Sequence, residues 1–343
     1  MRVLFTITGI GLGHATREYA IIKKLNCDVR IGTYLSAYDF FKDKYETFKI
    51  SYIKFPDNKF RVSFYKIIMY NLLAPLNLYL AYLRIKKEVK EFNPDLIISD
   101  SELVTGYASK RLKKPVIGIH NHNLERIKNI EKSKDRNLRL EAGYLYKLVE
   151  AGNKNCSRII VPELLGGKRD GKIRYIDPVI NESKKTIKNN AILIMLGGSR
   201  FTHPFIEGII PFLKKQKEEF IIFGYKDFKE GNIVSYKFNP DFIGYLKNCK
   251  GLITFAGYSA LSEALFYKVP SLVFSIPGHL EQYININTVS KIFMTDINSN
   301  NPEESLSKFL KDIPKQKRRL KRLKVKNGVD EAVRIIKNEV AKN

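Results

Sequence analysis

The chain has 343 residues, a length that favours two domains over one. Hydrophobic residues make up 44% of it and charged residues 28%, which excludes a disordered or fibrous chain. Sixty lysines and arginines against 35 aspartates and glutamates give a net charge of +25. Such a charge indicates an anionic partner: a nucleic acid, an acidic membrane surface or a phosphorylated small molecule.

The cysteines and the N-terminus indicate a cytoplasmic protein. Three cysteines lie far apart, and an odd number without a CxxC pair cannot close a disulfide framework. The apolar N-terminus lacks the long apolar core and cleavage site of a signal peptide, and is typical of a strand leading into a glycine turn. The uncharged run at 67–83 is short for a membrane span and contains Pro75, which favours a buried helix or one that touches a bilayer surface.

In the first 160 residues, short apolar runs alternate with helical patterns. The runs are rich in Ile, Val and Leu, which is typical of strands buried on both faces. Strands are predicted at 3–8, 29–33, 50–55, 96–99, 116–119 and 158–161. Helices are predicted at 14–25, 36–44, 64–92 with a break around Pro75, 106–112 and 138–153. This alternation predicts βαβ units and a parallel sheet.

A second domain follows the first. Residues 166–190 are polar, charged and glycine-containing, which indicates a linker. After it, strands are predicted at 191–196, 220–223, 233–236, 251–255 and 271–274, and helices at 204–217, 240–248, 259–267, 280–289 and 302–310. The predicted domains are 1–183, 184–320, and a basic C-terminal helix over 321–343 that could cross back to the first. Such domains would place an active site between them, at the carboxyl ends of their strands.

A glycine loop follows the first predicted strand. Gly9, Gly11 and Gly13 would leave backbone N–H groups free at a helix N-terminus, where anions bind. The spacing is GxGxG rather than GxGxxG, and the second strand lacks a terminal acid, so a dinucleotide is not expected. His14 could take a proton from an acceptor hydroxyl, or be a polar residue near a helix start. Arg17 could hold an acceptor phosphate or lie on the solvent face.

Three further stretches lie in the second half. Residues 197–199 (GGS) end a strand and 257–259 (GYS) precede a helix, so their N–H groups could face a diphosphate. Glu263 lies one helical turn after the second stretch, where a carboxylate could accept both ribose hydroxyls; otherwise it is an exposed helical residue. A third stretch brings three polar side chains to the same sheet edge: His279, Glu281 and Gln282. Carboxylate and amide groups suit sugar hydroxyls.

The order GGS, then GYSxxxE, then PGHLEQ resembles the GT-B glycosyltransferases, in particular family 28 and its lipid-linked muramyl-pentapeptide N-acetylglucosaminyltransferases. The resemblance covers nearly the whole chain and is strongest over 190–290. It implies an α/β fold of two Rossmann-like parallel-sheet domains facing each other across a cleft. It also implies a nucleotide-sugar donor, usually a UDP-sugar, on the C-terminal domain, an acceptor on the N-terminal domain, and inversion at the anomeric carbon.

The resemblance also assigns residues. His14 matches the general base of related plant and antibiotic glycosyltransferases, although GHATR departs from their GHxxP form. Donor contacts are predicted at Gly198, Ser199, Phe242 (through its backbone, at the base), Gly257, Tyr258, Ser259, Glu263, His279, Glu281 and Gln282. Acceptor contacts are predicted at Gly11, Gly13, Arg17, Asp100, His120 and Asn123. The stretch at 120–123 falls where the lipid-linked family carries His-Glu-Gln-Asn, and here Asn121 replaces the Glu.

No cofactor or metal is expected. Helix N-termini can stabilise a leaving nucleoside diphosphate without a metal. No DxD motif is present, and the nearest stretch, at 100–102, lies in the acceptor domain. The expected activity is an inverting, metal-independent transfer from a UDP-sugar to an acceptor hydroxyl, with a lipid-linked acceptor as a further candidate.

The basic charge leaves alternatives open. Basic residues around the apolar run at 67–83 are typical of peripheral binding to the cytoplasmic face of a membrane, but also of a buried helix with a solvated face. The basic tail favours nucleic acid, yet no RNA- or DNA-binding module is recognisable, so nucleic acid is not expected. Two alternative functions are a UDP-N-acetylglucosamine 2-epimerase, which would need several carboxylates and histidines in its cleft, and a non-catalytic binder of anionic membranes or nucleic acid.

Overall fold

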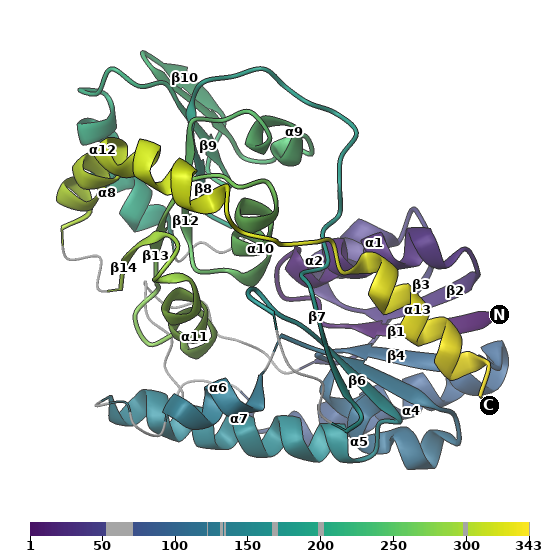
Figure 1. Cartoon of the computed structure of the whole chain (residues 1–343). Coiled ribbons are helices and arrows are strands. Elements are labelled where there is room, and N and C mark those ends of the chain that lie inside the picture. Colours follow the sequence, from purple (N-terminus) through teal and green to yellow (C-terminus); the bar gives the residue numbers. More distant parts are fainter. Residues whose placement is uncertain are drawn as a thin grey trace. The chain divides into compact units, whose positions relative to one another are not determined.

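The chain forms two compact units (Figure 1). The computed structural model describes residues 1–52, 71–121, 123–130, 133, 135–166, 171–197, 202–297 and 301–342. Described residues of the first unit precede Glu182 or follow Lys326, and those of the second unit lie within Glu182–Lys326. The predicted boundaries were after residues 183 and 320.

Within the described ranges, the first unit has a seven-stranded parallel sheet in the order β3-β2-β1-β4-β5-β6-β7. Its strands are β1 (Arg2–Ile7), β2 (Asp28–Thr33), β3 (Glu46–Lys49), β4 (Leu96–Asp100), β5 (Val116–Ile119), β6 (Arg158–Pro162) and β7 (Ile173–Ile176). The strand order reverses between β1 and β4, and in such sheets ligands bind at the carboxyl ends of the strands at this point.

Helices cover both faces of this sheet. They are α1 (Gly13–Leu25), α2 (Leu35–Phe41), α4 (Ala74–Phe92), α5 (Leu103–Leu112), α6 (Leu124–Asn129), α7 (Arg136–Lys154) and α13 (Val329–Val340). Alternate side chains of β1 point to opposite faces. Val3, Phe5 and Ile7 pack with α1, α2 and α13, whereas Leu4 packs with α4 and α5. The C-terminal helix α13 lies against α1 (Figure 1).

The described part of the second unit repeats the architecture, with sheet order β10-β11-β9-β8-β12-β13-β14. Its strands are β8 (Ile192–Met195), β9 (Phe220–Phe223), β10 (Phe228–Glu230), β11 (Ile233–Tyr236), β12 (Gly251–Phe255), β13 (Ser271–Phe274) and β14 (Met294–Asp296), and β10 runs antiparallel to β11. Its helices are α8 (His203–Leu213), α9 (Phe242–Leu246), α10 (Tyr258–Phe266), α11 (Leu280–Val289) and α12 (Pro302–Leu320). The prediction of two Rossmann-like parallel-sheet domains is confirmed.

Three predicted elements need correction. The strand predicted at 50–55 lies earlier, as β3, because Arg30 on β2 pairs with Glu46 both in strand register and as an ion pair; residues 53–55 lie outside the described part. The predicted linker at 166–190 contains β7, a short strand paired with β6. The described part of the helix predicted at 64–92 begins at Ala74, and Pro75 lies in its first turn, where a missing N–H costs nothing.

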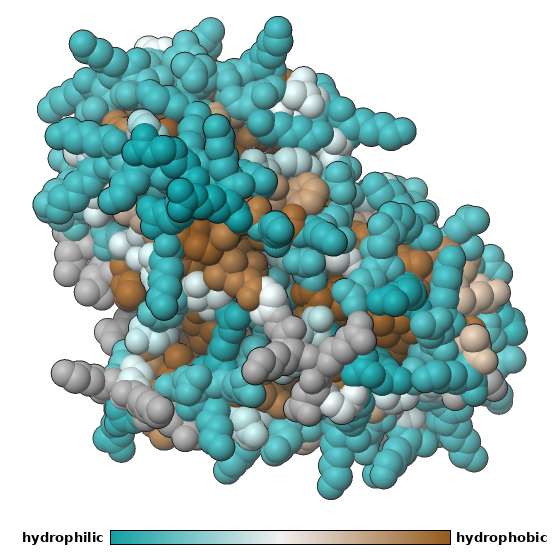
Figure 2. All heavy atoms as spheres, viewed as in Figure 1, coloured by the Kyte–Doolittle hydropathy of each residue, from teal (hydrophilic) through white to brown (hydrophobic). Residues whose placement is uncertain are grey.

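The surface on this face of the molecule is largely hydrophilic (Figure 2). Long hydrophilic side chains cover most of the face shown in Figure 2. Among the helices of the described ranges, none combines the length and apolar character that a bilayer span requires.

Candidate active site

The carboxyl ends of β1 and β4 bring His14 and Asp100 together. Strand register pairs Ile7 with Asp100, the last residues of the two strands. After β1 the loop turns through Gly11, whose φ of 71° suits glycine, and α1 begins at Gly13. His14 Nδ1 then lies 2.9 Å from Asp100 Oδ1. The Asp100 carboxyl is fully buried, whereas the His14 side chain remains 21% exposed.

The charge of Asp100 determines where the histidine proton lies. Burial by itself would raise the pKa of Asp100, but the positive charge of Arg17 and the contact with His14 outweigh it and hold the pKa below its usual range. An ionised carboxylate only accepts hydrogen bonds, so its contact with His14 is a hydrogen bond when Nδ1 carries the proton; Arg17 Nη2, 3.0 Å from the same Nδ1, then makes no hydrogen bond with it. The Nε2 atom of His14 then carries a lone pair that can take up a proton.

Arg17 completes the cluster from inside the unit. Its side chain is only 4% exposed and donates to Asp100 Oδ1 and to Asn121 Oδ1. The interpretation of Arg17 as a solvent-face residue is therefore wrong, because its guanidinium neutralises a buried carboxylate. Its predicted contact with an acceptor stays a prediction.

Glu18 is a residue that the sequence analysis missed. Its side chain is fully buried, and Oε1 lies 3.5 Å from Arg17 Nε. Burial first, and then the charge of Asp100, raises the pKa of Glu18 well above its usual value. A signal was available: helical spacing places Glu18 on the buried face of α1, together with Ile21 and Leu25.

Two predicted acceptor residues are held by contacts within the first unit. His120 is buried, and its Nε2 lies 3.0 Å from Asn153 Oδ1. Asn123 caps the start of α6 and donates to Glu163 Oε1 at 2.7 Å. His122 lies outside the described residues. Contacts of His120 and Asn123 with an acceptor stay predictions.

In the second unit, the predicted diphosphate turn lies at the carboxyl end of β12. Gly257 is the N-cap of α10 and, as a glycine, has no side chain with which to cap this helix. A Cβ atom at Gly257 would meet nothing within 4 Å, so the glycine leaves the start of α10 open. Tyr258 begins the helix with a buried side chain, and Ser259 follows it. The other predicted turn residues, Gly198 and Ser199, lie outside the described part of the chain.

Glu263 lies on α10, one turn after this start. It is half-buried, which corrects its interpretation as an exposed helical residue. Burial raises the pKa of Glu263 to about 8, so the carboxyl group is largely neutral at pH 7. Its carboxyl oxygens accept no hydrogen bond from the residues in the described ranges, whereas its backbone carbonyl accepts the N–H of Tyr267 at 2.9 Å.

The start of α11 carries the predicted sugar contacts. His279 is the N-cap, and burial lowers the pKa of its imidazole. Glu281 lies in the first turn. Gln282 is buried, and its Oε1 accepts the N–H of Ile276 at 2.9 Å, which leaves the amide Nε2 for a ligand. Asn285, one turn further, donates to the loop after β12 at 3.0 Å and so joins α11 to the start of α10.

Phe242, predicted near the base, is the first residue of α9. Its ring is buried and packs edge-on against Phe223 with 5.1 Å between the centroids. Its side chain therefore belongs to the fold, and only its backbone is available to a base, as the resemblance implies.

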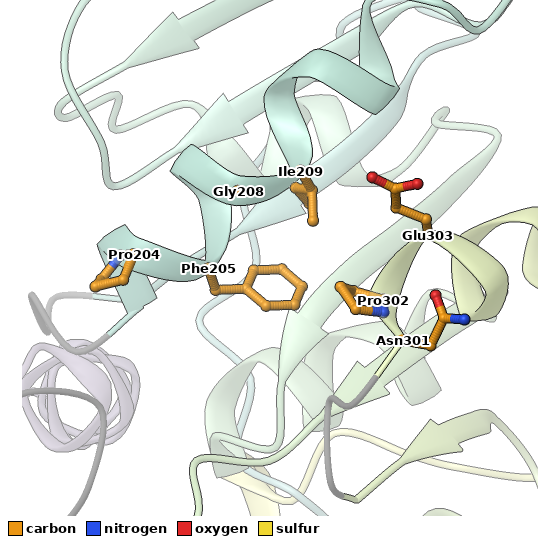
Figure 3. A pocket seen from close by; sticks show the side chains of 7 residues that line it. All are labelled: Pro204, Phe205, Gly208, Ile209, Asn301, Pro302 and Glu303. Carbon is orange, nitrogen blue, oxygen red and sulfur yellow. The ribbon is translucent and has the colours of Figure 1, made fainter.

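A cavity of about 500 Å³ lies between the first two turns of α8 and the start of α12 (Figure 3). Its lining is mostly apolar: Pro204, Phe205, Gly208, Ile209, Asn301, Pro302 and Glu303. It contains none of the predicted donor contacts. Within the described ranges, no group of three or more His, Cys, Asp or Glu side chains is arranged to hold a metal ion.

A family model described as Glycosyl transferase family 1 matches residues 1–314. The chain belongs to this family. It is 25% identical over 325 residues to an uncharacterized glycosyltransferase of Methanosarcina acetivorans, a match that covers 85% of this chain and 84% of the relative. It is similar in fold to the kitacinnamycin glycotransferase, with a TM-score of 0.70, 14% identity and 98% of both chains covered. It is also similar to VinC, solved in complex with dTDP, with a TM-score of 0.63, 10% identity and 100% of both chains covered.

The protein is therefore a glycosyltransferase with the GT-B fold, as the motif order predicts. The matched family is family 1, and the closer resemblance to family 28 stays a prediction.

Proposed function

We propose that this glycosyltransferase transfers a sugar from a UDP-sugar to an acceptor hydroxyl with inversion, and that His14 is the general base. The observation that carries the proposal is the 2.9 Å contact between His14 Nδ1 and the buried, ionised Asp100. In the proposed step, Nε2 takes the proton of the acceptor hydroxyl as its oxygen forms a bond to the anomeric carbon. The bond from that carbon to the phosphate oxygen breaks, and the nucleoside diphosphate leaves with the electron pair. A single displacement of this kind inverts the configuration.

The second unit supports a nucleoside diphosphate as leaving group. The start of α10, where Gly257 supplies no capping side chain, offers backbone N–H groups to a diphosphate, and the helix dipole stabilises negative charge there without a metal. The Glu263 carboxyl group, which makes no hydrogen bond with the described residues, suits ribose hydroxyls. Glu281 and the free Nε2 of Gln282 suit the sugar. The dTDP bound to VinC also supports a nucleoside diphosphate.

Ligand-dependent thermal stability tests the donor. A nucleoside diphosphate at ~100 times its dissociation constant should stabilise the protein by about 2.7 kcal/mol with a chelator present. A UDP-selective shift that disappears in Glu263→Ala is expected. His14→Ala should keep the shift and lose turnover. The absence of a shift with every nucleotide would contradict the proposal, and formation of UDP-N-acetylmannosamine without an acceptor would indicate the epimerase instead.

We further propose a lipid-linked acceptor and a peripheral position on the cytoplasmic face of an anionic membrane, and the exposed face of α4 supports this. Leu76, Tyr79, Leu80 and Leu83 are 41–56% exposed, and the opposite face is buried in the core. Four basic and two acidic residues follow on the same helix. Such a face suits the headgroup region of an anionic bilayer.

Vesicle co-sedimentation tests the membrane proposal. The protein should bind vesicles that contain anionic lipid, and the double variant Leu76→Ser, Leu80→Ser should lose this binding. Leu140→Ser, at another exposed leucine, is the matched control and should bind normally. Equal binding by all three proteins would exclude the α4 face.

A further inference from the structure

Glu18 is a fully buried acid that the proposed step does not use. It lies on α1, and the charged groups that face it are Arg17 and Asp100. Arg17 Nε, at 3.5 Å, is too far away for a normal hydrogen bond. A buried ionised carboxylate without hydrogen bonds is strongly destabilising. A fully buried Glu18 is therefore stable only if its carboxyl group is neutral or gains a hydrogen bond.

The carboxyl groups of Glu18 and Asp100 both have buried oxygen atoms that accept no hydrogen bond from the described residues. Within the described part of the chain, both carboxyl oxygens of Glu18 and the Oδ2 atom of Asp100 are buried and receive no hydrogen bond from a donor group. The two carboxyl groups lie against the same guanidinium, because Arg17 Nε is 3.5 Å from Glu18 Oε1 and Arg17 Nη2 donates to Asp100 Oδ1. Because two carboxylates only accept, a contact between them requires a proton. A single shared proton would satisfy the facing oxygens.

The surroundings decide which group holds this proton. Asp100 Oδ1 receives hydrogen bonds from the Arg17 guanidinium and from His14 Nδ1, and both donors favour its ionised form. Among the described residues, the one donor group near the Glu18 carboxyl is Arg17 Nε, at 3.5 Å. The pKa directions agree with this assignment: burial and the charge of Asp100 raise the pKa of Glu18, and the pKa of Asp100 is lowered despite its burial. These contacts favour Glu18 as the acid and Asp100 as the anion.

We propose that Glu18 is a positioning residue that stays protonated at neutral pH and donates a hydrogen bond to Asp100 Oδ2. This bond would hold the carboxylate so that its other oxygen faces Nδ1 of His14. The inference rests on the proposed role of His14 as general base. In this role Glu18 acts through the O–H group of its neutral carboxyl, and a negative charge at this position is not needed.

Difference infrared spectroscopy tests the proton without any sugar transfer. Glu18→Gln keeps the size of the side chain and offers an amide N–H to Asp100. The spectrum of wild type minus Glu18→Gln at neutral pH should contain the C=O stretch of one protonated carboxylic acid. A carboxylate signal in its place would overturn the proposal.

Turnover of two variants tests the positioning role. Glu18→Gln should retain kcat within about threefold. Glu18→Met has a similar size but no hydrogen-bond donor. It should lower kcat by at least about tenfold and leave the KM for the nucleotide-sugar unchanged. Equal losses in both variants would show that the charge of Glu18 is required, and unchanged turnover in Glu18→Met would show that it positions nothing. Either result overturns the proposal.

The two proposals fail in different ways. If Glu18→Met does not fold, as thermal unfolding would show, the glutamine variant and the infrared spectrum still decide. If the wild type transfers no sugar, the proposed function fails, and the infrared spectrum alone decides whether Glu18 holds the proton.

Discussion

Asp100 Oδ1 lies 2.9 Å from His14 Nδ1, although 86 residues separate the two in the chain. The parallel pairing of β1 with β4 creates this contact, because it brings the ends of both strands to one edge of the sheet. A histidine held by a buried, ionised carboxylate has one nitrogen committed as a donor and the other available as a base.

His14→Ala should lower kcat by about 10²- to 10⁴-fold, because the acceptor hydroxyl would lose its base. Binding of the nucleoside diphosphate should be unchanged, since the predicted donor contacts lie in the second unit. Steady-state kinetics and nucleotide titration measure the two effects separately. Retained turnover in this variant would exclude His14 as the base.

Asp100→Asn should lower both turnover and stability. The asparagine leaves the buried charge of Arg17 without its counter-ion, at a cost of about 3–5 kcal/mol. Because the folded state lowers the pKa of Asp100 from 3.8, the wild-type advantage should be complete above that pH and disappear as the pH falls below it. Denaturant unfolding as a function of pH measures this, and an advantage that grows on acidification would contradict it.

Glu263 should make stability and nucleotide affinity depend on pH in opposite directions. Its pKa is raised from 4.5 to about 8, so the folded protein holds a proton that the unfolded chain releases between these values. Its contribution to stability therefore falls as the pH rises through this window. Affinity for a nucleoside diphosphate should rise over the same window, because the ionised carboxylate accepts the ribose hydroxyls. Glu263→Gln should remove both dependences, as unfolding and titration at about pH 5.5 and about pH 8.5 would show.

Gln282 should have two separable roles. Gln282→Leu leaves the N–H of Ile276 without an acceptor and should cost about 1–3 kcal/mol. Gln282→Glu keeps an acceptor but loses the amide donor, so it should lose less stability and raise the KM for the donor sugar. Unfolding measurements and kinetics on the two variants distinguish loop support from sugar contact. An unchanged KM in Gln282→Glu would exclude the sugar contact.

Gly9→Ala should destabilise the first unit. A Cβ atom at Gly9 would lie 1.7 Å from the carbonyl oxygen of Tyr34, so the backbone at the end of β2 would have to move. We expect a loss of about 1–3 kcal/mol. Gly143→Ala, where a Cβ meets nothing within 4 Å, is the control and should stabilise α7 by about 0.5–1 kcal/mol. Unfolding in urea measures both variants, and equal stability would contradict the packing argument.

The sequence alone predicts most of the strands and helices, because apolar runs and helical spacing are properties of consecutive residues. It also predicts His14 and the glycine turn at 257–259 as site candidates, because a strand-to-helix junction with glycines leaves backbone N–H groups free and a histidine there can act as a base. It misplaces β3, and it misses β7 within a charged stretch. Both are short outer strands that depend on pairing with a neighbour rather than on their own composition.

The tertiary structure decided how the site residues are used. Arg17 has the sequence pattern of a surface residue, but it neutralises Asp100 inside the unit. Glu18 is one acid among 35 in the sequence, and only its burial against Asp100 and Arg17 gives it a role. The spacing of residues within a helix or strand is set by the local backbone. The charge that a buried group carries is set by the partners that strand pairing and helix packing bring to it from distant parts of the chain.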